Sequence, residues 1–573
     1  MPALSGSAPR GSCPAPFGVS APLSRAAGHL DRLLILAAVA AVAASYAAYL
    51  RDMGGLLHSD VATEILTGRE MFRQKTIFLS EYYHSTELIL LRSSLIMALW
   101  TFVTRDMLDT FRLSVVTEVA LQSVCYVYAA RRLGLSPLAA AIGLLAFFGV
   151  RGYGSGRMCG LGGASYGVMH CAVFLILGYC AAARSGRLAR ADQAARLIIP
   201  VLAFFSGLSS LRFIAAILGP LLMAHCAAKL WTPLPRDWAG DALLREILFW
   251  TAVCAAGWII TVQAVMPRGF GPMSYGTSAL NGLAVNAAES APALARDVAA
   301  LNPVARAGAG LSPLSARGAS GLLCAAFYAA CAWGIAWTRK PYLPARRAAY
   351  AFLLMSIWPP ALLMLVMFPP GEMTVRYLFN AYVLLAAAAG FLYEDLRSFR
   401  PALARAFLVL CCSLCVFNSF ALIREIPGFA ARNPSVYAIR HLDDVGESLR
   451  RHGLDKAYSL YYQSTVQQVL TDGRYEVWPV LGDMTPAKYL VRYDVYDPGR
   501  AGERAAFIRI EPPLPYRIPP NVINTVTDES LLAGAAEREV LPDPEVSVEI
   551  FYFDRNPFVF PPGHDPAADY AGR

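Results

Sequence analysis

Residues 33–50 read LLILAAVAAVAASYAAYL, an apolar run without a charged side chain. A helix needs about 20 mostly apolar residues to cross the hydrocarbon core of a bilayer. The run follows a tail, residues 1–32, that is too long and too rich in proline for a typical signal peptide. We therefore predict that residues 33–50 form a retained membrane anchor.

Similar runs recur over the first three quarters of the chain. The weakest one, 88–104, holds Arg92 and is followed by Arg105 and Asp106, so it is expected to lie partly in the membrane interface. A chain that begins inside and ends outside makes an odd number of crossings, which favours eleven or thirteen of them. The candidate spans are 33–50, 88–104, 111–129, 137–150, 165–183, 197–210, 213–228, 247–266, 319–337, 350–368, 377–393 and 405–423.

The composition agrees with a membrane protein. Of the 573 residues, 56% are hydrophobic and 16% are charged, and the mean hydropathy is +0.43. An ordinary globular protein is about 25% charged. These values predict a polytopic α-helical membrane protein and exclude a disordered chain, a collagen-like fibre and a cytosolic enzyme. The net charge of +9 is scattered between the apolar runs, which suits orientation in a membrane better than binding of nucleic acid.

The basic loops predict the orientation, because cytoplasmic loops retain Lys and Arg. The clearest are 184–196, 339–347 and 397–405, and the tail 1–32 carries three arginines of its own. We expect these segments to be cytoplasmic, in a bacterial inner membrane. The segments then expected outside are 51–87, 151–164, 267–318, 369–376 and everything after residue 424.

The chain after Arg424 has a different character. Residues 428–573 lose the long apolar runs and gain charge, Pro and Tyr. This change divides the chain into a cytoplasmic tail (1–32), a membrane domain (33–427) with an outer loop (51–87), and an extracytoplasmic C-terminal domain (428–573) of α/β or α+β class. The expected elements are a helix at 434–452 and strands at 456–461, 475–480, 507–510 and 546–553, with a turn at 471–473.

The outer loop carries the first candidate for chemistry. Asp60 and Glu64 follow the first span and are four residues apart, so on a helix both carboxylates share one face. A carboxylate at the membrane surface can take a proton from a hydroxyl group as a general base. The alternative interpretation is that Ser59 or Asp60 caps a helix.

Aromatic and histidine side chains gather in the same loop. Tyr82, Tyr83 and His84 stand directly before an apolar run, and His58 precedes Asp60. Rings that carry hydrogen-bonding groups suit the face of a sugar, so these residues are candidates for acceptor binding. An interfacial aromatic belt is the competing interpretation. The two histidines are irregularly spaced, so no cofactor is predicted and a divalent metal is left open.

Two further segments offer positive charge for a phosphate. Arg151 and Arg157 flank glycines in RGYGSGR, where backbone N–H groups could cradle a phosphate. Arg376 and Tyr377 open a late span, and a guanidinium there can bind a phosphate through two parallel hydrogen bonds. A flexible loop and a snorkelling side chain are the alternatives.

Taken together, the layout resembles the GT-C class of membrane glycosyltransferases, which use a polyprenyl-phosphate sugar. His58-Ser59-Asp60 matches the early acidic residue of that class, and Arg376-Tyr377-Leu378 matches a late span opening in bacterial members. A proline pair that often closes the outer loop is replaced by His84-Ser85-Thr86-Glu87. The tail also resembles some bacterial members over residues 458–462, 464–470, 472–474 and 476–480.

The resemblance implies a function. A GT-C-like enzyme with about eleven to thirteen membrane helices would move a sugar from its lipid-phosphate carrier to a hydroxyl of a cell-envelope glycan, lipid or protein, with inversion. Asp60 and Glu64 would be catalytic, and Arg376, Tyr377, Arg151 and Arg157 would bind the donor phosphate. The alternatives are a transporter or flippase of lipid-linked sugars and a non-catalytic membrane scaffold.

Overall fold

The structure is a computed structural model of the chain. It describes residues 21–57, 59–83, 90–149, 167–185, 188–230, 241–265, 326–327, 329–331, 352, 355, 384–430, 441–488, 491–511, 526–527, 529–542 and 547–566. The predicted site residues that lie outside the described residues are His58, His84, Arg151, Arg157, Arg376 and Tyr377.

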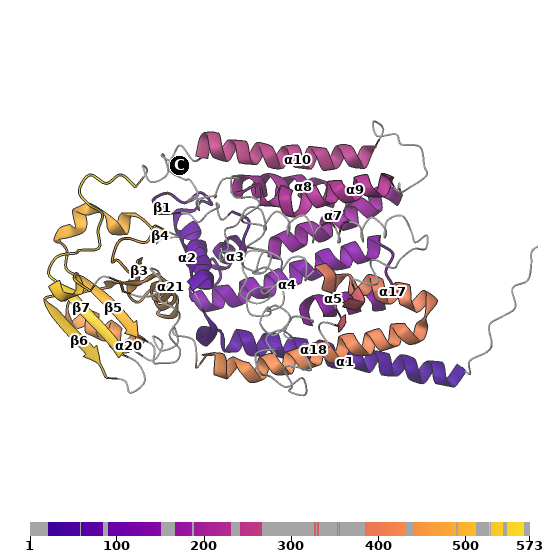
Figure 1. Cartoon of the computed structure of the whole chain (residues 1–573), viewed down its shortest axis with the longest axis horizontal. Helices are drawn as coiled ribbons and strands as arrows, with labels where there is room; N and C mark the ends of the chain where they lie inside the picture. The colour runs from indigo at the N-terminus through magenta and orange to yellow at the C-terminus, as the bar shows by residue number, and fades with distance from the viewer. Residues whose placement is uncertain are drawn as a thin grey trace, which may run out of the picture.

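The first part of the chain is a bundle of apolar helices (Figure 1). Six of the described helices are long and apolar enough to cross a membrane. They are α1 (Ala21–Arg51), α4 (Met107–Arg132), α7 (Gly167–Ser185), α8 (Arg190–Ser209), α10 (Ala242–Ile260) with its continuation η3 (Thr261–Val265), and α18 (Pro401–Ala430). Shorter helices are α5 (Pro137–Gly149), η2 (Ile214–Leu218), α9 (Gly219–Leu230) and α17 (Ala389–Phe399). The prediction of several apolar helices long enough to cross a membrane is confirmed for the described residues, whereas the bounds of a membrane domain stay a prediction.

Ion pairs gather at the end of the bundle that lies opposite the C-terminal domain (Figure 1). Arg132 at the end of α4 pairs with Asp192 of α8 at 2.8 Å, and Arg405 of α18 lies 3.7 Å from Asp31 of α1. We call this the basic end, and the other the domain end. The grouping follows the predicted basic loops, while the assignment of the basic end to the cytoplasm stays a prediction.

The described part of the candidate span 88–104 contains no helix of membrane-crossing length. Its described part contains only α3 (Ser93–Trp100), and eight residues of helix rise about 12 Å. Asp106 then caps α4 by accepting a hydrogen bond from the backbone N–H of Asp109 at 2.7 Å. The charges at Arg92, Arg105 and Asp106 interrupt the apolar run, and the described helix between them is short.

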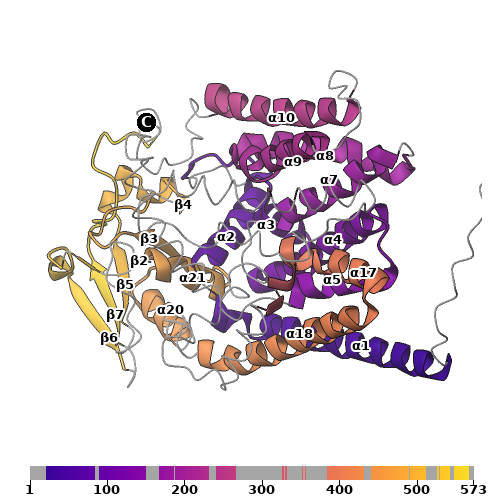
Figure 2. The same cartoon turned by 45° about the vertical axis from the view of Figure 1, so that its right-hand side comes forward.

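The outer loop forms ordered structure at the domain end. It contains η1 (Met53–Leu56), α2 (Ser59–Gln74) and β1 (Tyr82–Tyr83). Helix α2 runs crosswise to the bundle helices, between the bundle and the C-terminal domain (Figures 1 and 2). Its apolar side chains share a core cluster with α1, α4 and helix α21 (Tyr461–Leu470) of the C-terminal domain.

The C-terminal domain is built on a mixed sheet. Its five strands are ordered β3-β2-β5-β7-β6, with β2 parallel to β3 and β5, and β7 antiparallel to β5 and β6. The predicted strands are found with small shifts in their ends, and the turn at 471–473 is confirmed. The elements are α20 (Leu442–Arg451), β2 (Lys456–Leu460), α21, β3 (Glu476–Val480), β4 (Val491–Arg492), η7 (Asp494–Tyr496), η8 (Pro498–Gly502), β5 (Ala505–Glu511), η9 (Leu532–Gly534), β6 (Glu537–Leu541) and β7 (Ser547–Phe553).

The two faces of this sheet are covered differently. One face packs against the apolar side of α20, through Leu442, Val445 and Leu449. The other face is aromatic, and the outer loop supplies one of its members: Tyr83 is fully buried among side chains of the C-terminal domain. The loop 51–87 therefore shares a hydrophobic core with the region after residue 428.

Candidate functional site

Asp60 and Glu64 both lie on α2, where the sequence placed them on a helix. Asp60 stands in the first turn and is exposed, whereas Glu64 is only 4% exposed. The two positions point about 40° apart on an ideal helix, since successive residues turn by about 100°. That difference is enough to put one carboxylate in solvent and the other against α3.

A glycine explains how Glu64 becomes buried. A Cβ atom on Gly68, one turn after Glu64, would stand 2.6 Å from the carbonyl oxygen of Ser94 and 2.8 Å from the Cβ of Met97. Only a residue without a side chain permits α2 and α3 to approach so closely. The close approach brings the start of α3 onto the carboxylate of Glu64.

Arg92 and Ser94 surround the Glu64 carboxylate. Arg92 Nη1 lies 3.2 Å from Glu64 Oε1, and the Arg92 side chain is 18% exposed. The backbone N–H and the hydroxyl of Ser94 face the same carboxyl group. Even so, Glu64 Oε2 and Ser94 Oγ are buried without a hydrogen-bond partner among the described residues. Buried polar atoms of this kind are uncommon and often mark functional sites.

Burial sets the acidity of Glu64. Loss of water around the carboxylate raises its pKa, while Arg92 and Ser94 act in the opposite direction and do not cancel the effect. Helix α2 lies outside the six helices of membrane-crossing length. A buried carboxyl group with a raised pKa holds its proton more tightly than an exposed one, and perturbed carboxyl groups of this kind are candidates for functional residues.

Glu118 is a second acid at this site that the sequence reasoning missed. It lies in α4, where the hydroxyl of Ser93 faces its carboxylate and Glu64 acts on it electrostatically. A Cβ on Gly167, at the start of α7, would collide with Glu118 Oε2 and stand 2.9 Å from Gln122 Nε2. The available signal was a single acid inside an apolar run, a pattern that marks functional residues in membrane helices.

The capping interpretation of the start of α2 finds no support in Ser59. Its side chain is 1% exposed, and its hydroxyl makes no hydrogen bond to any described residue. The Ser59 carbonyl instead accepts a hydrogen bond from the hydroxyl of Thr63 at 2.6 Å. The first turn of α2 therefore presents Asp60 to solvent without a serine cap.

Tyr82 and Tyr83 have structural partners. The two residues form β1, which pairs antiparallel with β4, so that Tyr82 stands opposite Arg492. The hydroxyls of Tyr82 and Thr67 lie 2.9 Å apart, and the Tyr83 ring packs edge-on against Tyr493 with centroids 5.5 Å apart. With 4% and 0% exposure both rings stabilise the contact between loop and domain, and their predicted role in sugar binding stays a prediction.

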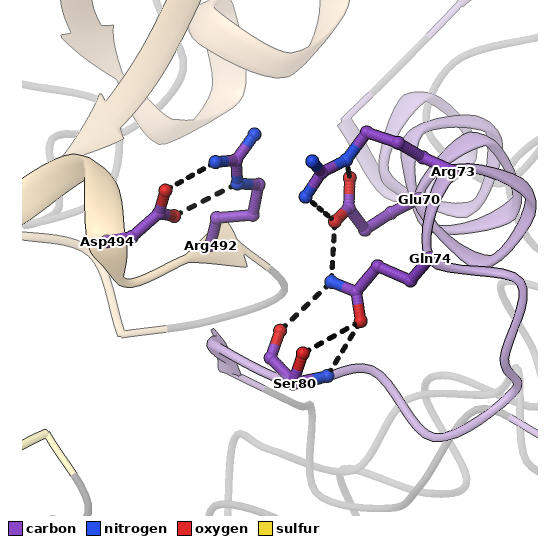
Figure 3. Close-up of polar contacts among 6 residues, drawn as sticks. All are labelled: Glu70, Arg73, Gln74, Ser80, Arg492 and Asp494. Atoms are coloured by element: carbon purple, nitrogen blue, oxygen red, sulfur yellow. Dashed lines mark hydrogen bonds and ion pairs between the residues drawn. The ribbon is translucent and has the colours of Figure 1, made fainter.

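The last turn of α2 and strand β4 each carry an ion pair of their own, and the two pairs face each other across the contact (Figure 3). Glu70 accepts two hydrogen bonds from Arg73, at 2.9 and 2.5 Å, and one from Gln74 at 2.6 Å. The Gln74 side chain also exchanges hydrogen bonds with Ser80, which fixes the chain reversal that leads into β1. On the facing side, Arg492 forms a two-bond pair with Asp494.

A tight turn of the C-terminal domain meets the bundle at the start of α4. Asp472 and Gly473 have φ angles of 53° and 70°, a conformation that Gly and Asp tolerate better than most residues. Asp472 Oδ1 accepts a hydrogen bond from the backbone N–H of Met107 at 3.2 Å. A Cβ on Gly473 would stand 3.1 Å from Arg69 Nη1 of α2. The turn thus binds the start of α4 and lies close to Arg69 of α2.

The predicted phosphate-binding residues Arg151, Arg157, Arg376 and Tyr377 lie outside the described residues, so their role stays a prediction. Among the residues that the structure describes, no three His, Cys, Asp or Glu side chains come together as a metal site would require. The described site therefore consists of the buried Glu64, the half-buried Glu118, the exposed Asp60 and the Arg92 guanidinium, where α2, α3 and α4 meet.

No protein-family model matches this chain, and no curated protein matches it in sequence.

Proposed function

We propose that this protein is a membrane glycosyltransferase that moves a sugar from a polyprenyl-phosphate carrier to a hydroxyl group of a cell-envelope glycan, lipid or protein. The observation that carries the proposal is the position of Asp60. It is an exposed acid on a crosswise helix, held between an apolar bundle and a mixed α+β domain, directly beside the buried Glu64–Arg92 pair.

The chemistry needs a base for the acceptor and positive charge for the leaving group. Asp60 takes the proton of the acceptor hydroxyl while the hydroxyl oxygen forms a bond to the anomeric carbon. The bond from that carbon to the phosphate oxygen breaks, and the electron pair leaves on the polyprenyl phosphate. A single displacement of this kind inverts the anomeric carbon.

Glu64 acts through the helix that carries Asp60. Its ion pair with Arg92 fixes the first turns of α2 against the start of α3, and Gly68 keeps the two helices in contact. Arg376, Tyr377, Arg151 and Arg157 are proposed to bind the donor phosphate, because a guanidinium stabilises the negative charge of the leaving group. The bilayer supplies the lipid-linked donor.

The test is sugar transfer by the purified full-length protein with a polyprenyl-phosphate sugar and a hydroxyl acceptor. Asp60→Asn is expected to lower kcat by about 10²–10⁴-fold, the contribution typical of a general base. Asp109→Asn is the matched control, because Asp109 is an exposed acid at the start of α4. Equal rates for Asp60→Asn and wild type would remove Asp60 as the base, and a wild type inactive with every donor would reject the enzyme.

A flippase of lipid-linked sugars is the second candidate, and Glu118 is the observation that favours it. An acid inside a helix of membrane-crossing length is typical of proton relays in transporters. In proteoliposomes that carry a fluorescent lipid-linked sugar, a flippase would lose movement of the lipid on Glu118→Gln. A transferase would show sugar transfer and no lipid movement in the wild type.

A further inference from the structure

An apolar patch lies on the surface at the end of α3 and on the turn that follows it. Leu99, Phe102 and Val103 are 61%, 76% and 70% exposed, so most of each side chain touches no other part of the protein. The Phe102 ring meets the Phe72 ring of α2 edge-on, with centroids 4.6 Å apart. Neighbouring apolar side chains at this exposure mark a surface that a membrane or a partner covers.

The patch lies beside the apolar part of α4 and not beside its polar start. Trp100 Nε1 donates a hydrogen bond to Thr117 Oγ1 of α4 at 2.8 Å, and α3 lies on the bundle side of α2 (Figures 1 and 2). Arg112 and Arg132 of α4 are about 20 residues apart, a rise of about 30 Å, which is the thickness of a hydrocarbon core. A core bounded by these two arginines would hold Thr117, and with it the end of α3, about 8 Å inside its boundary.

The surface of α4 at this level is also apolar. Val116 and Val124 are 54% and 68% exposed, and Ala120 between them is exposed as well. Side chains four residues apart share one side of a helix, so the three form a stripe along α4. The stripe begins at the residue beside Thr117, which binds Trp100. The patch of α3 therefore continues the apolar surface of a helix that is long enough to cross a membrane.

The backbone of the turn after α3 is suited to hydrocarbon. The N–H groups of residues 101–104 all donate hydrogen bonds to carbonyl groups of α3, at 2.8 to 3.2 Å. The hydroxyl of Thr101 donates to the carbonyl of Met97 at 2.8 Å. An N–H group without a partner is strongly unfavourable in lipid, where no water can bind it. The turn therefore ends α3 without presenting an unpaired backbone donor.

We propose that Leu99, Phe102 and Val103 insert among the acyl chains of the lipid leaflet at the domain end of the bundle. Arg105 and Asp106, both exposed, return the chain to the polar surface, where a guanidinium suits the phosphate of a lipid head group. The proposal does not rest on sugar transfer, because a transferase and a flippase would make the same contact with lipid.

The experiment places the photoreactive residue p-benzoylphenylalanine at position 102 of the full-length protein in nanodiscs of phosphatidylcholine and phosphatidylglycerol. Irradiation joins this residue to the C–H bonds that it touches, and mass spectrometry identifies lipid on the labelled peptide. Position 124 of α4 is the reference for contact with lipid. Position 540 is the aqueous control, because Val540 of β6 is 53% exposed on the C-terminal domain (Figure 1).

Lipid adducts are expected at positions 102 and 124 and not at position 540. Adducts at position 124 without lipid adducts at position 102 would overturn the proposal. If position 102 joins only to protein, a protein surface and not the lipid covers the patch.

A second measurement does not depend on the photoreactive residue. Phe102→Trp keeps an aromatic ring, and its fluorescence in excess of wild type is measured with quenchers. Lipids brominated near the head group should quench this excess more than lipids brominated near the chain end, since the patch lies about 8 Å inside the core. Val540→Trp is the control, and iodide in the water should quench it alone. Quenching of both variants by iodide, with no effect of brominated lipid on Phe102→Trp, would place the patch in water and overturn the insertion.

Discussion

The two ends of the helix bundle hold their buried acids differently. At the domain end the buried carboxylate of Glu64 has Arg92 as its described ion-pair partner, and its Oε2 has no hydrogen bond from a described residue. At the basic end Asp192 is fully buried, pairs with Arg132 and accepts hydrogen bonds from Tyr128 and from the backbone of Ala189. Burial shifts the protonation of a charged group most where its hydrogen bonds are incomplete. The domain end is therefore suited to proton exchange, whereas the ion pair at the basic end stabilises the fold.

The ends also differ in what covers them. The domain end is covered by the mixed sheet, through β1–β4 pairing, the Tyr83 ring and the Asp472 turn. The described residues of the basic end are held by ion pairs between neighbouring helices, such as Arg132 with Asp192. A change at one end should consequently leave the other end intact, and the following predictions test that independence.

The largest effect is expected from Tyr83→Ala, which removes a fully buried ring from the core of the C-terminal domain. Truncation of a buried aromatic side chain costs about 3–5 kcal/mol. The C-terminal domain should become sensitive to protease, and the thermal midpoint should fall. Tyr83→Phe, which keeps the ring, is the control, and equal protease resistance in both variants would contradict the shared core.

A comparable loss is expected at the basic end from Asp192→Asn. Asp192 is fully buried and accepts hydrogen bonds from Tyr128 at 2.9 Å and from the backbone of Ala189 at 2.7 Å, beside its pair with Arg132. Breaking a buried ion pair costs about 3–5 kcal/mol. The thermal midpoint should fall while the protease resistance of the C-terminal domain is unchanged. Glu447→Gln, at an exposed acid of α20, provides the control, and a midpoint as high as wild type would show that the pair stabilises little.

A pH-dependent effect is expected from Glu64→Gln. The folded state raises the pKa of Glu64 above its ordinary value of 4.5, so the folded protein binds the proton more tightly than the unfolded chain. Its contribution to stability is complete below pH 4.5 and is lost as the pH rises through the folded-state pKa. The wild type should therefore lose stability over this window relative to Glu64→Gln, which has no proton to lose.

The test of Glu64 is to measure the thermal midpoints of both proteins from pH 4 upwards. Each unit by which folding shifts the pKa of Glu64 corresponds to about 1.4 kcal/mol of stability. The same variant should lower sugar transfer, because Arg92 loses the partner that fixes α2. Parallel stability curves for the two proteins across this window would show that burial does not control Glu64.

The smallest effect is expected from Arg73→Gln. The Arg73 side chain is 55% exposed, and exposed ion pairs contribute about 0.2–1 kcal/mol. Glu70 also keeps its hydrogen bond from Gln74, so the reversal into β1 should survive (Figure 3). The thermal midpoint should change little, as it should for Arg451→Gln, another exposed pair of the C-terminal domain. A loss as large as that of Tyr83→Ala would show that the ion pairs, and not the aromatic core, hold the domain.

The sequence alone predicted the features that depend on local pattern. Apolar runs of membrane length predicted the helices, and alternating β-type runs between turn signals predicted the central strands, since both follow from side-chain periodicity along one segment. The charges around Arg92 and Arg105 also weakened the candidate span 88–104, whose described part contains only the short helix α3. A helix at Asp60 and Glu64 likewise follows from the local sequence.

Only the tertiary structure decided which of those side chains are buried and what they meet. Glu64 differs from Asp60 because Gly68 admits α3 on one side of α2, and Glu118 joins them from a helix more than fifty residues along the chain. Tyr83 enters the core of a domain that begins several hundred residues later, and Arg184 meets His225 across two helices. Such contacts depend on how distant surfaces fit together, and no periodicity within a single segment encodes that fit.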